Sequence, residues 1–159
     1  MYGPISIDLA ALPDDAVAPR WISPDMDALS IPWAPLIGGG IGFVNPPYST
    51  RRGGLLSWFR MARLAQLAGS TVLLLSCAGP GSRAIALARA GASEILWCGR
   101  RLACLHPDTG EPAPANNSDQ SVVVFAPPGG PALERTWTPP AAACVGKSRS
   151  SWPNRKRGE

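Results

Sequence analysis

The chain has 159 residues, of which 45% are hydrophobic and 16% charged, so we expect one globular domain. Its formal net charge of +4 is compatible with a polyanionic partner, and its 17 glycines and 18 prolines predict long loops. No apolar run is long enough to span a membrane, and the chain does not open like a signal peptide, so we expect a cytoplasmic protein without a membrane partner. The four cysteines form no C-x-x-C pair and there is one histidine, so we expect reduced thiols and no metal site.

The first half of the chain alternates apolar runs with turn residues. Residues 5–11 form a short apolar run that meets an acid, Asp8, as a buried strand does when it leads into a ligand loop. Residues 41–44 predict a second buried strand, which ends at Asn45 because the prolines that follow cannot donate to a ladder. Residues 55–67 carry apolar side chains at helical spacing, interleaved with arginines, and predict an amphipathic helix with a basic side.

The second half repeats the alternation of strand and helix. Residues 71–76 show the strongest buried-strand pattern, and residues 82–90 predict a short alanine-rich helix. Residues 94–98 predict a further strand. Residues 102–105 and 121–125 predict a terminal hairpin with a wide loop between its strands.

This order of elements predicts an α/β fold: a Rossmann-like, mainly parallel, doubly wound sheet with a C-terminal antiparallel hairpin, in a single domain. Periodicity is lost near the end, so we place the domain at residues 1–128 and a flexible Pro/Ala/Ser-rich, basic tail at residues 129–159. Sheets of this kind bind ligands at the carboxyl ends of their strands. Four polar residues fall at predicted strand ends or just after them: Asp8, Asp27, Asn45 and Ser76.

A short motif carries the predicted chemistry: Asn45, Pro46, Pro47 and Tyr48. The exocyclic amino group of adenine is a poor nucleophile because its lone pair is delocalised into the ring. The Asn45 side-chain oxygen and the Pro46 carbonyl can accept its two hydrogens and draw it toward a tetrahedral geometry. Tyr48 offers a flat face on which an extruded base can stack. The same residues also suit an ordinary turn, but their place after an apolar strand favours attack on a sulfonium methyl.

This motif and six other segments, in the same order, resemble the phage-type DNA N6-adenine methyltransferases, the Dam-like family. The segments span residues 7–11, 18–22, 27–33, 73–75, 99–100 and 122–125. The resemblance implies site-specific transfer of a methyl group from S-adenosylmethionine to a flipped adenine in double-stranded DNA. It also implies a place in a bacterial host cell, if a phage or prophage encodes the chain.

The resemblance further implies which residues bind the cofactor. Asp8, Ala10 and Ala11 would line its methionine part, and Asp27 is similar to the acid that faces its adenosine. Acids suit these tasks because the cofactor offers an ammonium group, ribose hydroxyls and an amino group. A solvated loop or a helix cap is the alternative interpretation of such acids. Because only four residues precede the first predicted strand, we expect an N-terminally short domain.

We predict that four arginines on or just before the predicted helix contact DNA phosphates: Arg51, Arg52, Arg60 and Arg63. A solvated helix face is the alternative for these arginines. The Asn-Pro-Pro-Tyr motif also serves enzymes that methylate amino groups in RNA or a glutamine amide in proteins, so the motif alone leaves those acceptors open. A second class of hypothesis is a non-catalytic DNA-binding remnant of the fold. The sequence predicts neither the target site nor the oligomeric state.

Overall fold

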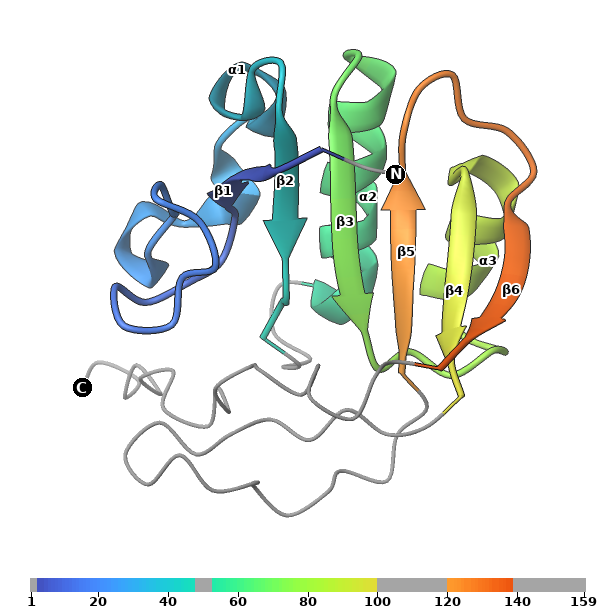
Figure 1. Cartoon of the computed structure of the whole chain (residues 1–159). Helices are drawn as coiled ribbons and strands as arrows, with labels where there is room; N and C mark the ends of the chain where they lie inside the picture. The colour runs from blue at the N-terminus through green and yellow to red at the C-terminus, as the bar shows by residue number, and fades with distance from the viewer. Residues whose placement is uncertain (1–2, 48–52, 100–119, 139–159) are drawn as a thin grey trace.

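A computed structural model describes residues 3–47, 53–99 and 120–138 (Figure 1). These residues form one six-stranded sheet with helices, in the strand order β1-β2-β3-β5-β4-β6. The strands are β1 (Ile5–Asp8), β2 (Ile41–Val44), β3 (Thr71–Ser76), β4 (Glu94–Cys98), β5 (Ser121–Phe125) and β6 (Leu133–Trp137). The helices are α1 (Trp33–Ile37), α2 (Gly54–Leu67) and α3 (Arg83–Gly91), with two 3-10 helices, η1 (Pro24–Met26) and η2 (Ala28–Ser30).

Strand direction makes this a mixed sheet. β1, β2 and β3 pair in parallel, and β4 pairs in parallel with β6. β5 lies between β3 and β4 and is antiparallel to both. β5 is therefore the one reversed strand among the described strands, and the predicted α/β class with one sheet is confirmed.

The described helices cover one face of the sheet. α2 contacts α1, α3 and β3, and Figure 1 shows these helices behind the sheet. No helix of the described residues lies on the other face, so the predicted doubly wound arrangement is not confirmed. In β3, buried side chains alternate with half-buried ones. The apolar run of residues 71–76 therefore predicts a strand with two apolar faces. It does not predict whether helices cover both of those faces.

The predicted C-terminal hairpin is not confirmed either. Residues 121–125 form β5 as predicted, but β5 pairs with β3 and β4, and residues 102–105 lie outside the described residues. The predicted tail at residues 129–159 contains β6, so the sheet extends beyond residue 128. β6 is exposed along its whole length, which explains why its sequence lacks the apolar pattern of a buried strand. Residues 139–159 lie outside the described residues.

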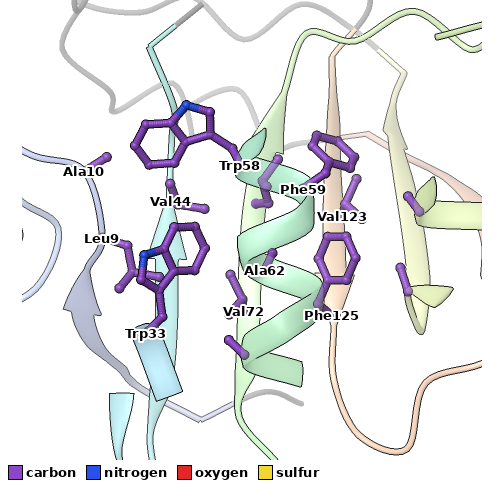
Figure 2. Close-up of a cluster of buried hydrophobic side chains, with 14 of the residues drawn as sticks. Leu9, Ala10, Trp33, Val44, Trp58, Phe59, Ala62, Val72, Val123 and Phe125 are labelled. Carbon is purple, nitrogen blue, oxygen red and sulfur yellow. The ribbon is translucent and has the colours of Figure 1, made fainter. Parts of the chain in front are cut away.

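Helix α2 supplies the centre of the core (Figure 2). Five of its residues are buried: Trp58, Phe59, Ala62, Ala65 and Gln66. The ring of Phe59 meets Phe125 edge-on, with 6.0 Å between the ring centroids. Leu67, which belongs to the apolar stripe predicted from the sequence, is 64% exposed. Gln66 is buried in its place because its amide forms hydrogen bonds at the end of the helix.

Candidate functional site

The candidate site lies at the edge of the sheet where β1, β2 and β3 end. Asp8 is the last residue of β1, Ser76 is the last residue of β3, and Asn45 directly follows β2. Asp8 is in register with Phe43 on the neighbouring parallel strand, so Asn45 lies two positions beyond it. Three of the four polar residues predicted at strand ends therefore lie at one edge of the sheet, and Asp27 is the fourth.

Asn45 is held in a buried position by the proline segment. It is 9% exposed, Pro46 is buried and Pro47 is half-buried, whereas Tyr48 lies outside the described residues. The two prolines end β2 as predicted, since neither has an N–H for the ladder. An amide and a carbonyl at such a position form stronger hydrogen bonds than they would in water.

Asp8 binds backbone groups of the protein itself through its carboxylate. It is 0% exposed, and its carboxylate accepts hydrogen bonds from the backbone N–H groups of Ala10, at 3.1 Å, and Val17, at 3.3 Å. Its own backbone N–H donates to the Arg20 carbonyl at 2.8 Å, and its carbonyl accepts from Ile22 at 2.8 Å. Asp8 therefore ties the loop that follows β1 back onto the strand, and its predicted contact with a cofactor stays a prediction.

Ala10 and Ala11 lie beneath the surface at the same strand end. Both are 0% exposed, and Ala10 belongs to the hydrophobic core. The N–H of Ala11 donates to the Ile22 carbonyl at 3.1 Å. Both methyl groups are therefore enclosed by the protein, and the predicted contact of these two residues with a cofactor stays a prediction.

Asp27 follows a 3-10 helix and not a strand, contrary to the sequence prediction. It has a φ of 50°, which is uncommon for a residue other than glycine, and its carboxylate accepts a hydrogen bond from the Ser30 hydroxyl at 2.6 Å. The chain reaches it from Trp21, which bridges to Asp8. Because the backbone of Asp8 bonds to that segment and Leu9 bonds to β2, the Trp21 segment and β2 flank opposite sides of β1.

A pocket of about 330 Å³ borders this segment. It is lined by Ile7, Arg20, Trp21, Ile22, Met26 and Leu36. Its size falls at the lower end of the range of small-molecule sites, and such sites have mainly apolar walls. Met26 directly precedes Asp27, so a carboxylate lies next in the chain to one wall of the pocket.

The sequence analysis does not single out a tryptophan that reaches the carboxyl edge. Trp58, on α2, is 6% exposed and packs against Trp33, with 6.0 Å between ring centroids. Figure 2 shows its indole beside Val44, the last residue of β2, with the ring nitrogen turned away from Trp33. Its position in the second turn of a helix that starts soon after the Asn-Pro-Pro-Tyr motif is the signal that could have identified it.

Of the four predicted arginines, the structure describes Arg60 and Arg63, and these two differ in their surroundings. Arg51 and Arg52 lie outside the described residues, and Arg60 is exposed. Arg63 is turned inward, because its guanidinium donates to the Gln66 side-chain oxygen at 2.6 Å and to the Gly91 carbonyl at 2.8 Å.

The partners of Arg63 lie at the edge of the sheet opposite Asn45. Gly91 ends α3 ahead of β4, and Gln66 donates to the carbonyl of Ala126, which follows the reversed strand β5. Both partners therefore belong to the amino edge of the parallel strands, opposite Asn45. Helical spacing places Arg63 beside Arg60, but its half-buried guanidinium is bonded to Gln66 and Gly91, and its predicted contact with DNA stays a prediction.

The described residues hold few other reactive groups. Burial raises the pKa of the Cys98 thiol, so the thiol is protonated near neutral pH. Within residues 3–47, 53–99 and 120–138, no three His, Cys, Asp or Glu side chains gather into a group that could hold a metal ion. No helix in that part of the chain is long and apolar enough to cross a membrane.

Comparison with known proteins gives one match. A family model described as DNA N-6-adenine-methyltransferase (Dam) matches residues 1–140. No curated protein and no solved structure matches the chain. The matched residues contain all six strands, the proline segment after β2 and the pocket beside β1.

Proposed function

Because the chain belongs to the DNA N-6-adenine-methyltransferase (Dam) family, we propose that it transfers a methyl group from S-adenosylmethionine to N6 of a flipped adenine in double-stranded DNA. Family membership implies DNA adenine methylation in general. The observation that supports this reaction at this site is the buried position of Asn45 and Pro46 at the carboxyl end of β2.

The target amino group would be held by two acceptors. The side-chain oxygen of Asn45 and the carbonyl of Pro46 would each accept one N6 hydrogen, which localises the nitrogen lone pair toward the methyl donor. Pro47 restricts the backbone, so little ordering is needed when the base arrives. Tyr48, next in the chain, would stack on the flipped base.

The pocket beside β1 fits part of the cofactor. S-adenosylmethionine, when bound, supplies an electrophilic methyl on a sulfonium sulfur. The apolar walls suit the flat adenine ring, and the Asp27 carboxylate can accept hydrogen bonds from ribose hydroxyls. Asp8 would act by holding the loop of Ala10 and Ala11 in place, since its oxygens bind that loop.

DNA would approach the carboxyl edge of the sheet. Arg51 and Arg52 precede α2 in the chain and Arg60 is exposed on it, so we propose that these three contact phosphates. Arg63 is left out of this set because its donors are used within the protein.

The test is transfer of labelled methyl groups from S-adenosylmethionine to unmethylated duplex DNA, followed by nucleoside analysis. We expect label in N6-methyladenine. Label in RNA or protein but not in DNA would show that the chain transfers methyl groups to a different substrate from the one proposed. If no acceptor is labelled, and calorimetry shows DNA binding without cofactor binding, the chain is a non-catalytic DNA-binding member of the fold and the proposal is wrong.

A further inference from the structure

Strand β6 (Leu133–Trp137) lies at one end of the sheet. It pairs with β4, and within residues 3–47, 53–99 and 120–138 no strand pairs with its other side. Figure 1 shows β6 beyond β4, with no labelled element on its outer side. All five of its residues are exposed. An edge strand of this kind offers a row of backbone N–H and carbonyl groups to a strand of another chain.

The ladder with β4 shows which backbone groups of β6 point outward. The Leu133 N–H donates to the chain just before β4 at 3.1 Å, and the Trp137 carbonyl accepts from the chain just after β4 at 2.7 Å. Both ends of β6 therefore face β4. Because successive residues of a strand point their backbone groups to alternate sides, the N–H and carbonyl groups of Glu134 and Thr136 face away from the sheet.

The features that usually keep an edge strand from pairing are weak in β6. The strand contains no proline and no lysine. Its two charged side chains already have partners in the chain, since the Glu134 carboxylate accepts from Arg89 at 2.7 Å and Arg135 forms an ion pair with Glu94 at 3.1 Å. Trp137, in contrast, leaves a large apolar side chain 38% exposed.

The sequence of β6 is complementary to itself in one antiparallel register. A two-fold axis can join the outward groups of two copies if it is centred on Glu134, Arg135 or Thr136. The first two centres set like charges directly opposite each other, which is unfavourable. The third centre sets Thr136 opposite its own copy, a favourable pair. It also sets Arg135 opposite Trp137 on the same face, where a guanidinium can stack on an indole.

We propose that β6 is a dimer interface, at which it pairs with β6 of a second copy of the chain, antiparallel about a two-fold axis at Thr136. The two six-stranded sheets then form one continuous sheet with an isologous contact. The axis reverses strand direction, so the carboxyl edges of the two copies, each with its Asn45, point in opposite directions. The two candidate sites therefore work independently, and this inference does not depend on the proposed function.

Two substitutions at one position of the full chain separate the interface from folding. Thr136→Pro removes an outward N–H and leaves the ladder with β4 complete, since proline is tolerated where the N–H of an edge strand faces solvent. Thr136→Val is the matched control, because it keeps the N–H and the branched side chain. A third variant, Trp137→Lys, places a positive charge opposite Arg135 of the second copy.

Sedimentation velocity over a range of chain concentrations measures the association. We expect the parent chain and Thr136→Val to reach twice the 16.7 kDa of one chain, and Thr136→Pro to keep the mass of one chain. For Trp137→Lys we expect the dissociation constant of the dimer to rise about tenfold or more, because two Arg–Trp contacts are replaced by repulsion.

Oxidative cross-linking tests the register. In the proposed register the two copies of residue 136 form a hydrogen-bonded pair with Cα atoms about 5.5 Å apart, within reach of a disulfide. The two copies of residue 135 lie diagonally, about 7–8 Å apart, which is too far. We therefore expect Thr136→Cys to form a covalent dimer and Arg135→Cys to form none beyond that of the parent chain, whose own four cysteines supply the background.

The proposal is overturned if the parent chain has the mass of one copy at every concentration, or if folded Thr136→Pro remains dimeric. If circular dichroism shows that Thr136→Pro is unfolded, the other variants decide. An unchanged dissociation constant in Trp137→Lys, or a cross-link through Arg135→Cys and not through Thr136→Cys, contradicts the interface. We expect single-turnover methyl transfer to be the same in Thr136→Val and Trp137→Lys, so loss of the dimer and loss of the proposed function are distinguishable.

Discussion

The two edges of the sheet use buried polar side chains in different ways. At the amino edge, Arg63 donates to Gln66, Gln66 donates to the Ala126 carbonyl at 2.6 Å, and the Ser93 hydroxyl donates to the same carbonyl at 2.5 Å. These donors end on acceptors of the protein itself. At the carboxyl edge, the proposed function assigns the buried side chain of Asn45 and the carbonyl of Pro46 to a substrate instead.

This difference shows that buried polarity alone does not identify a site. Gln66, at 2% exposed, is more buried than Asn45, at 9%. The Gln66 side chain connects α2 to the chain after β5, whereas Asn45 directly follows a parallel strand, at the edge where sheets of this kind bind ligands. Variants at each edge should therefore separate activity from stability.

The largest effect is expected from Asn45→Ala. Methyl transfer should fall by about 100-fold or more, because one of two acceptors for the target amino group is lost in the transition state. Single-turnover rates with saturating cofactor and DNA measure this loss, and circular dichroism checks that the variant is folded. An unchanged rate would remove Asn45 from the reaction.

The matching change at the amino edge is Gln66→Ala. We expect it to lower the free energy of unfolding by about 1–3 kcal/mol, because Arg63 and the Ala126 carbonyl lose a buried partner. Urea unfolding measures the loss. The neighbouring Leu67→Ala is the control: Leu67 is 64% exposed, so its effect should stay within about 0.5 kcal/mol. If Gln66→Ala reduced the single-turnover rate while stability was unchanged, the comparison of the two edges would fail.

A smaller effect distinguishes the two arginines of α2. Arg60→Ala should weaken DNA binding and reduce the slope of log affinity against log salt by about one, because an exposed phosphate contact is removed. Arg63→Ala should leave that slope unchanged and reduce stability instead. Fluorescence anisotropy with labelled duplex DNA at several salt concentrations measures both slopes, and equal slopes for the two variants would contradict this division.

The smallest effect is expected at β6, the exposed strand at the end of the sheet. Hydrogen bonds from Arg89 and Trp97 lower the pKa of Glu134 below its ordinary value of 4.5. A carboxyl whose pKa is lowered on folding stabilises the protein above its unfolded pKa, and this stabilisation disappears as the pH falls through its folded pKa.

Glu134→Gln should therefore reduce thermal stability slightly at neutral pH, and the difference from the parent chain should shrink below pH 4.5. Thermal unfolding of both chains across this pH range tests the sign. A difference that grew as the pH fell would show that the pairing with Arg89 does not stabilise the fold.

The local residue pattern was sufficient to predict the bounds of most of the strands. Residues 41–44, 71–76, 94–98 and 121–125 form β2, β3, β4 and β5 with the predicted bounds. Each run is rich in aliphatic residues and bounded by turn residues, and these properties do not depend on the rest of the fold. β6 was missed because an exposed edge strand does not need an apolar face.

The sequence by itself thus determined the α/β class, the family and the position of Asn45 at a strand end, because a motif and its flanking strand are contiguous in the chain. The tertiary structure alone decided that β5 inserts between β3 and β4, that Arg63 turns inward and that Trp58 lies beside Val44 at the carboxyl edge. The physical reason is that residue spacing specifies which side chains share a face. Their partners are set by segments distant in sequence, which meet only when the sheet and helices pack.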